Sequence, residues 1–569
     1  MPESEDSKKE GFNIQEEQKI PVIPDFKSKD QVDVRYPLIE PFAYAHIYWD
    51  SSRNELIYQV EEPIIDESEQ KTLNIISEGI KELINMSFIA VNKKETVIEY
   101  LEKNVKLLIS ELGLKITEDT YYKVMYYIYR DFVGLNEIEP LMKDYHIEDI
   151  ECNGLGAPIY IVHRKFRNIR TSVAYTDMKK LANFVEKLAQ KSGRYVSYSN
   201  PLLDASLPDG SRVNATYTED VSSKGPTFTI RKFTKTPWTP TKMIETRTLS
   251  PEIMAYLWLA VEYEFNILMV GGTGSGKTSL LNTIAFFIPP QARVVSIEDT
   301  HELQLSHDNW LPSVAREGSG SVDIEGRKHG EVTLFDLLKE SFRQNPNYVI
   351  VGEIRGAEAY VLFQGMASGH PSFGTMHAND VPTVVRRLET PPINLSPALV
   401  ESLDTVCLMA HVTIKGAPAR RLKAIQEVVS VGQTLGDVKL NTPFVWDPAT
   451  DRFFFKTQSR IFEKITTRHG VTKEQLASEF RIRSKLLMEM LNKKIFDSEK
   501  VQEIIHRYYK NPKDILKEFN IDTNAQIITA RPSLQQKTPQ INQLGQAPTQ
   551  QTQPKNEAGW FENLKKRFA

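Results

Sequence analysis

The feature that most constrains the fold of this chain is an apolar strand that runs directly into a glycine-rich loop and then into a helix. The strand covers residues 266–270, and the loop after it has the pattern G-x-x-x-x-G-K-[ST]. The loop residues are Gly271, Gly272, Thr273, Gly274, Ser275, Gly276, Lys277, Thr278 and Ser279. The apolar residues after the loop recur at the spacing of one helix face, at Leu280, Leu281, Ile284 and Ala285. This order of elements predicts an α/β domain.

The same loop predicts a binding site for nucleotide phosphates. Its glycines let the backbone curl around the β- and γ-phosphates with N–H groups pointing inward. Lys277 adds a positive charge against the phosphates, and the Thr278 hydroxyl is a ligand for magnesium. The loop also opens a helix, whose N-terminus favours anions. ATP and Mg²⁺ are therefore the predicted cofactors.

Composition narrows the class of protein. A chain of 569 residues with 40% hydrophobic residues is long enough for three or four domains. A net charge of −4, with Lys and Arg spread along the chain, argues against a protein that mainly binds a nucleic-acid backbone. Cys152 and Cys407 are too few for a disulfide framework or a four-cysteine zinc site. The charged N-terminus and the lack of an 18-residue apolar run lead us to expect a cytoplasmic protein.

Changes of pattern along the chain predict its domain organisation. Apolar spacing indicates helices in the second half of 31–145, and mixed strand-like and helical runs indicate an α+β region after it. Pro237 and Pro240 mark a linker, and the pair Ser250–Pro251 marks the next helix start. Thr472 opens a capping box. The predicted segments are a disordered N-terminus (1–30), an α-rich region (31–145), an α+β domain (146–234), a linker (235–249), a P-loop motor domain (250–460), a small helical domain (461–520), a disordered Gln- and Pro-rich tether (521–557) and an amphipathic peptide (558–569).

Three clusters after the loop carry candidate catalytic groups, because a P-loop alone leaves GTPases, kinases, helicases and transporters open. The strand at 294–297 leads into Glu298, Asp299 and Glu302, which we expect to support magnesium and its waters. The strand at 348–351 leads into Glu353, the candidate for orienting or deprotonating the attacking water. A third strand leads into His377, a candidate sensor of the γ-phosphate.

The four motifs, in this order along the chain, closely resemble those of the secretion ATPases of type II and type IV systems. In that family they are the Walker A, Asp, Walker B and His boxes. The resemblance implies a RecA-like motor domain, hexameric rings, and a nucleotide that lies between the N-terminal and motor domains. It also extends to residues 204–213 and 228–233. From it, Arg212 and Arg231 inherit a role against the phosphates.

Within this family, the chain looks like the archaeal branch. It lacks the tetracysteine module of the bacterial type II and pilus-extension branch, and residues 36–45 and 444–451 are similar to archaeal members. That branch powers archaellum rotation and assembly or type IV pilus assembly, and the sequence leaves both open. The resemblance implies a motor on the inner face of the cell membrane that works against an integral-membrane platform protein.

Two other functions compete with a filament motor. One is a nucleic-acid translocase or DNA-transfer ATPase of the same superfamily, although no nucleic acid is expected as a partner. The other is a scaffold that binds nucleotide without hydrolysing it. The intact Lys277, Thr278 and Glu353 argue against that scaffold.

The last twelve residues, 558–569, predict a docking peptide. Trp560, Phe561, Leu564 and Phe568 fall on one face of a helix, next to the basic run 565–567. An exposed apolar face generally marks a binding site. We therefore expect this peptide to bind a platform or scaffold protein, or an anionic membrane.

Overall fold

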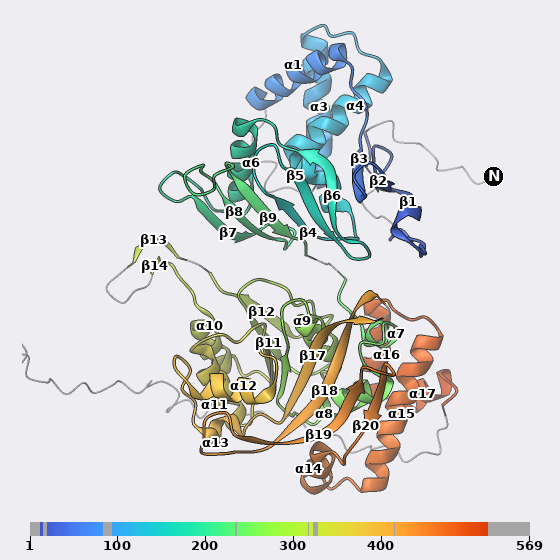
Figure 1. Cartoon of the computed structure of the whole chain (residues 1–569), viewed down its shortest axis with the longest axis vertical. Helices are drawn as coiled ribbons and strands as arrows, with labels where there is room; N and C mark the ends of the chain where they lie inside the picture. Colours follow the sequence, from blue (N-terminus) through green and yellow to red (C-terminus); the bar gives the residue numbers. More distant parts are fainter. Residues whose placement is uncertain are drawn as a thin grey trace, which may run out of the picture. The chain divides into compact units, whose positions relative to one another are not determined.

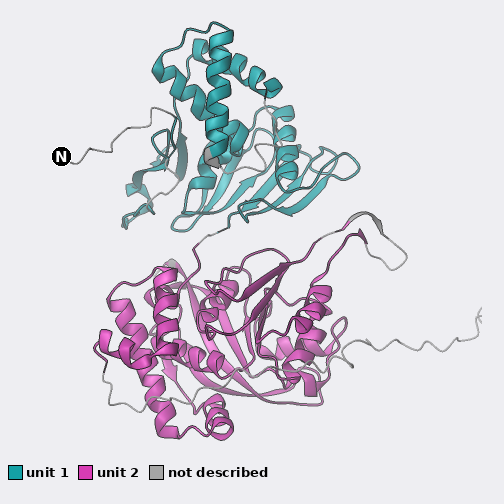
Figure 2. Ribbon diagram, turned by 180° about the vertical axis from the view of Figure 1, so that it is seen from behind, with its two compact units in different colours: residues 1–234 teal, residues 235–569 magenta. Residues whose placement is uncertain are grey.

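A computed structural model describes residues 12–14, 20–83, 94–233, 236–316, 318–322, 328–414 and 416–521. The chain divides into two compact units, residues 1–234 and 235–569 (Figure 2). The predicted tether, apart from Ile521, and the predicted docking peptide lie outside the described residues. Part of the predicted disordered N-terminus is ordered, because Phe12 and Ile14 are buried in the core of the first unit.

The first unit combines a sheet with helices (Figure 1). Its strands are β1 (Asp33–Ile39), β2 (Ala43–Asp50), β3 (Glu55–Glu61), β4 (Ile147–Cys152), β5 (Pro158–His163), β6 (Arg167–Ala174), β7 (Leu202–Ser206), β8 (Arg212–Thr216) and β9 (Thr227–Arg231). Its α-helices are α1 (Glu67–Leu83), α3 (Lys94–Glu111), α4 (Glu118–Ile128), α5 (Glu139–Lys143) and α6 (Met178–Lys191). Shorter turns are η1 (Lys29–Gln31), the π-helical η2 (Tyr129–Val133) and η3 (Asn136–Ile138).

One sheet joins the two regions that the sequence separates in this unit. The strand order is β1-β2-β3-β6-β5-β4-β9-β8-β7. Strand β3, from the region 31–145, pairs in parallel with β6, from the region 146–234. Buried residues of both regions also share a single apolar core. Short-range sequence patterns do not indicate this pairing, because it spans more than a hundred residues of chain.

The second unit holds the glycine-rich loop. Its strands are β10 (Ile267–Val270), β11 (Val294–Glu298), β12 (Trp310–Val314), β13 (Ser319–Val322), β14 (Lys328–His329), β15 (Tyr348–Val351), β16 (Ser372–Met376), β17 (Thr405–Ile414), β18 (Ala417–Val431), β19 (Val438–Asp447) and β20 (Arg452–Phe455). Its helices are α7 (Pro240–Glu245), α8 (Pro251–Glu262), α9 (Lys277–Ala285), α10 (Leu334–Ser341), η4 (Phe342–Gln344), α11 (Glu358–Ala367), α12 (Val381–Glu389), α13 (Pro397–Val400), α14 (Arg460–His469), α15 (Lys473–Asn492), α16 (Ser498–Lys510) and α17 (Pro512–Glu518).

The main sheet of this unit has nine strands in the order β12-β11-β15-β16-β10-β17-β18-β19-β20. The six strands from β12 to β17 are parallel, and β17 to β20 form an antiparallel extension. Strand β10 lies in the middle, between β16 and β17. The unit is therefore an α/β domain, as the sequence predicts, and its parallel strands deliver their carboxyl ends to one edge.

Helices cover both faces of this sheet, which explains why its strands β10 and β15 are continuous apolar runs (Figure 1). Alternate residues of β10 enter different cores: Ile267 and Met269 pack with α8 and the C-terminal helices, and Leu268 and Val270 pack with α11 and α12. Because every side chain of β10 is buried, the strand holds the start of the glycine-rich loop in a fixed place.

The helices predicted as a separate domain at 461–520 share a core with the α/β sheet. Helix α15 packs on α8, where the buried Arg483 guanidinium pairs with the carboxylates of Glu262 and Glu479. The predicted linker 235–249 also contains regular structure, since Thr239 caps α7 and Pro240 occupies its first turn. Proline fits there because the first turn of a helix needs no N–H donor.

Candidate functional site

The glycine-rich loop leaves β10 and continues into the first turn of α9. Gly276, the residue before α9, has φ 93°, and Gly274 has φ 68°, so both adopt a left-handed conformation that favours glycine. A Cβ on Gly271 would lie 2.4 Å from the carbonyl oxygen of Met409, so this position also requires glycine. The Ser275 hydroxyl donates to the Gly272 carbonyl at 2.8 Å. This closed loop at a helix N-terminus fits a phosphate chain.

Lys277 directs its ammonium group into this loop. The side chain is only 7% exposed, and Nζ donates to the Gly272 carbonyl at 3.0 Å. Burial lowers the pKa of Lys277, while the carboxylates of Glu353 and Glu302 oppose that shift. A cation held by a loop carbonyl in a partly desolvated place is ready to bind phosphate oxygens.

Glu353 follows β15 and meets Lys277 and His377 at the same sheet edge. Its carboxylate accepts a hydrogen bond from Arg355, and Oε1 lies 3.4 Å from His377 Nε2. Burial works to raise the pKa of Glu353, but the charges of Arg355, His377 and Lys277 lower it overall. Glu353 is therefore a carboxylate at neutral pH, which is the state that can accept a proton from water.

His377 follows β16 and lies between the loop and the acid. Its ring nitrogens are 3.4 and 3.5 Å from Lys277 Nζ. Burial and the positive charge of Lys277 lower the pKa of His377. The order β15-β16-β10 places Glu353, His377 and Lys277 after three adjacent parallel strands. The three predicted residues are thus brought together by the sheet.

The predicted acidic cluster after β11 divides into two parts. Glu298 is 1% exposed, and its Oε1 accepts hydrogen bonds from the backbone N–H groups of Glu302 and Leu303 at 2.9 and 2.8 Å. Its Oε2 lies 3.2 Å from His301 Nδ1. Because both oxygens have protein partners, this geometry gives Glu298 the role of folding the loop after β11. The sequence instead predicts it as support for magnesium.

Asp299 and Glu302 are exposed, in contrast to the buried Glu298. Asp299 is 40% exposed and lies 3.9 Å from Arg355, and Glu302 is exposed. Among the described residues, no three His, Cys, Asp or Glu side chains are grouped as a preformed metal site. The oxygen donors at this edge, which include the partly exposed Thr278, still suit Mg²⁺. Mg²⁺ is usually held by one or two protein groups together with waters and substrate phosphates.

The two predicted arginines of the first unit face each other across adjacent strands. Arg212 on β8 is the direct partner of Arg231 on β9. Two acids compensate the like charges: Asp204 binds Arg212 through both oxygens, at 2.9 and 3.1 Å, and Asp149 lies 3.3 Å from Arg231. Arg231 is 62% exposed. Two cations directly opposite each other on neighbouring strands destabilise the sheet unless acidic side chains compensate them. The same two cations also concentrate positive charge, which attracts anions.

Two residues of the site escaped the sequence reasoning. Arg355 lies two residues after Glu353 and binds its carboxylate. The short separation in sequence could have indicated this contact. Arg420 on β18 donates from Nε to the carbonyl of Gly274 at 3.0 Å, from 146 residues away in the chain. No local pattern around Arg420 indicates that contact.

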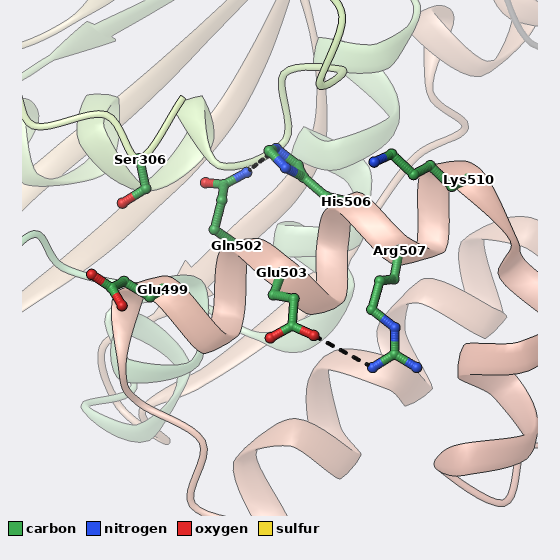
Figure 3. A pocket seen from close by; sticks show the side chains of 7 residues that line it. All are labelled: Ser306, Glu499, Gln502, Glu503, His506, Arg507 and Lys510. Carbon is green, nitrogen blue, oxygen red and sulfur yellow. Dashed lines mark hydrogen bonds and ion pairs between the residues drawn. The ribbon is translucent and has the colours of Figure 1, made fainter. Parts of the chain in front are cut away.

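A separate pocket lies along α16 (Figure 3). It has a volume of about 360 Å³ and is lined by Ser306, Glu499, Gln502, Glu503, His506, Arg507 and Lys510. Two of its charged groups, Glu503 and Arg507, form an ion pair with each other at 3.8 Å. None of its residues belongs to the four motifs, so the candidate site is the loop edge and not this pocket.

Comparisons with known proteins agree with the motifs. A family model described as "Type II/IV secretion system protein" matches residues 136–433. An uncharacterized protein of Methanocaldococcus jannaschii is 35% identical over 519 residues, which cover 86% of this chain and 92% of that protein. The type IV secretion system protein PtlH of Bordetella pertussis is 29% identical over 322 residues, covering 50% of this chain and 92% of its own.

A solved structure shows a weaker likeness. The VirB11 ATPase of the Brucella suis type IV secretion system is 23% identical, with a TM-score of 0.26, and the match covers 51% of this chain and 93% of that one. A TM-score this low supports no argument about the arrangement of the chain. Within the described part of this protein, no helix is long and apolar enough to span a bilayer.

Proposed function

The chain belongs to the type II/IV secretion system protein family, and from that membership we propose that it hydrolyses ATP to drive a motor. The observation that supports this most is the meeting of Lys277, His377 and Glu353 at one sheet edge, next to a loop shaped for phosphates. The proposal includes the RecA-like character of the second unit and a homohexameric assembly.

Each residue has a distinct role in this proposal. The loop N–H groups and Lys277 bind the phosphates, and Glu353 accepts a proton from the attacking water. His377, with its lowered pKa, is neutral at pH 7 and can donate one N–H to a γ-phosphate oxygen. Thr278, Asp299 and Glu302 would hold Mg²⁺ and its waters, and bound Mg²⁺ supplies positive charge against the phosphates. Arg355 keeps the Glu353 carboxylate in place before the phosphates arrive.

The proposed work is the assembly or rotation of a type IV pilus-like filament, an archaellum or a pilus. A relative that matches 86% of this chain is archaeal, which supports the archaeal branch. We propose that the protein acts in the cytoplasm at the inner face of the cell membrane, on an integral-membrane platform protein. In a motor of this kind, hydrolysis changes the conformation of the subunit and the platform receives the motion.

Hydrolysis by the purified full-length chain tests the proposal directly. Phosphate release should require both ATP and Mg²⁺, and it should not increase when double- or single-stranded DNA is added. Strong stimulation by DNA, together with DNA binding that weakens steeply with salt, would instead support a DNA-transfer ATPase. Nucleotide binding without any phosphate release would support a nucleotide-binding scaffold.

Replacing Arg212 or Arg231 by Ala should reduce hydrolysis by about 10²-fold, because each guanidinium is proposed to stabilise charge on the transferring phosphoryl group. Both side chains are partly exposed, so the thermal unfolding midpoint should change little. Steady-state phosphate release and a thermal melt provide the two measurements. Arg53→Ala is the matched control, since Arg53 is 50% exposed and pairs with Asp50 in the same unit. If both variants hydrolyse ATP at the parental rate, the first unit does not complete the site.

Deleting residues 558–569 should leave ATP hydrolysis intact and reduce recruitment to membranes. The physical reason is the apolar face that the sequence predicts for Trp560, Phe561, Leu564 and Phe568 beside three basic residues, which suits a partner groove or an anionic membrane. Co-sedimentation with membranes measures recruitment, and liposomes with and without anionic lipid separate the two targets. A truncated chain that sediments like the full chain would remove this role.

A further inference from the structure

The antiparallel hairpin β17–β18 forms a wall behind the glycine-rich loop. Strand β17 runs beside β10, with Val270 opposite Leu408, so the hairpin continues past the point where the loop leaves the sheet. A Cβ on Gly276 would meet Cδ of Arg420 at 3.4 Å and Cε of Met409 at 3.5 Å. The loop therefore packs directly on two side chains of this hairpin.

Arg420 makes a polar contact from this wall. Its Nε donates to the carbonyl oxygen of Gly274 at 3.0 Å, while its neighbour across the hairpin is His411. The Gly274 carbonyl and the Ser275 N–H belong to one planar trans peptide, so they point in opposite directions. The Ser275 N–H accordingly points away from Arg420 and donates across the loop to the Gly272 carbonyl, at 3.4 Å between N and O. Fixing one side of this peptide fixes the other.

The next residue, Arg421, holds the strand that carries Arg420. Arg421 is 5% exposed and binds both oxygens of Asp451, at 2.8 and 3.0 Å. Its Nη1 also donates to the carbonyls of Thr246, at 3.1 Å, and of Arg420, at 2.9 Å. A buried, bidentate arginine with backbone partners is a rigid support. Arg420 is thus presented to the loop from a fixed backbone.

We propose that Arg420 is a positioning residue for the phosphate-binding loop. It holds the Gly274 carbonyl away from the phosphate side and so keeps the following N–H directed inward before nucleotide arrives. This inference rests on the proposed function, because the ligand of the loop is taken to be a nucleotide phosphate chain. The physical effect is preorganisation. Donors that already have the bound orientation lose no further conformational entropy when phosphate binds.

Arg420→Met in the full-length chain tests the proposal, because methionine keeps an unbranched stem against Gly276 and removes the donor. We expect the Kd for a fluorescent ADP analogue to rise about tenfold, the loss of one charge-assisted hydrogen bond. In the nucleotide-free protein, amide hydrogen exchange should become faster in peptides that cover residues 271–280. Arg420→Lys should recover part of the affinity, since its ammonium can donate to the same carbonyl. The matched control is Arg452→Met, an exposed arginine on β20 of the same sheet.

The two measurements separate this inference from the proposed function. If Arg420→Met binds the analogue as the parental protein does and its loop exchanges at the parental rate, Arg420 does not position the loop. If the parental protein itself fails to bind the analogue, the proposed function is overturned. The exchange comparison then still decides whether Arg420 holds the loop. An equal loss of nucleotide affinity in Arg420→Met and Arg452→Met would also contradict a specific role for Arg420.

Discussion

Replacing Lys277 by Ala is expected to reduce ATP hydrolysis by at least about 10²- to 10³-fold, the usual cost of removing one donor that stabilises transition-state charge. Nucleotide affinity should fall by about 10- to 100-fold, because a charge-assisted hydrogen bond to phosphate is worth about 1.5–3 kcal/mol. The side chain is buried, and its ammonium group donates a hydrogen bond to the Gly272 carbonyl of the loop. Steady-state phosphate release and equilibrium binding of a fluorescent nucleotide measure the two effects.

The fold should survive this change. Lys277 carries a burial cost that lowers its pKa, so removing the charge relieves a penalty while it gives up one hydrogen bond to a backbone carbonyl. The matched control is Lys339→Ala, which removes an exposed lysine from α10. Parental hydrolysis by the Lys277 variant would contradict the assignment of this loop as the phosphate site.

The central part of the site could be predicted because its residues sit next to strands that the sequence shows clearly. The strands before Lys277 and Glu353 are short apolar runs, the strand before His377 has fewer apolar residues but is fully buried, and parallel strands bring their carboxyl ends to one edge. The sequence does not give the strand order β15-β16-β10, since that order depends on how crossover connections pass over the sheet. The sequence predicts that the three residues lie at the carboxyl ends of their strands, but it does not predict the distances between them.

The acidic cluster shows why equal residue types can differ in role. Glu298, Asp299 and Glu302 read alike in sequence, but the chain after β11 turns back so that Glu298 accepts N–H bonds from that turn. Gly352, beside it at the end of β15, makes room, since a Cβ there would lie 3.1 Å from Cγ of Glu298. The glycine that replaces the usual acid at this strand end was a signal for this packing.

The contacts that sequence reasoning missed are those between segments far apart in the chain. Arg420 reaches Gly274 only because the register of the hairpin β17–β18 places it beside the loop. By contrast, the capping box at Thr472 predicted the start of α15, and the structure confirms this start. The buried ion pair of Arg483 with Glu262 then attaches that helix to α8, and neither residue signals its partner 221 residues away. Local patterns predict elements, whereas registers and packing determine partners.

Glu353→Gln should separate binding from hydrolysis. The amide keeps the size of the side chain and can still accept a hydrogen bond from Arg355, but it cannot take a proton from water. We expect ATP to bind with at least parental affinity and turnover to fall by about 10²- to 10⁴-fold, the usual contribution of general-base catalysis. Bound, unhydrolysed ATP should also stabilise the proposed hexameric ring.

Single-turnover hydrolysis, equilibrium ATP binding and size-exclusion chromatography with ATP test these three expectations. Glu463→Gln, which changes an exposed glutamate on α14, is the matched control. The pKa of Glu353 is lowered overall by Arg355, His377 and Lys277, so the wild-type carboxylate is charged across neutral pH and the comparison is between a charged and a neutral group. Near-parental turnover by Glu353→Gln would show that another carboxylate at this end of the sheet is the general base. Asp299 and Glu302 would then be the next residues to replace, because both lie within electrostatic reach of Arg355.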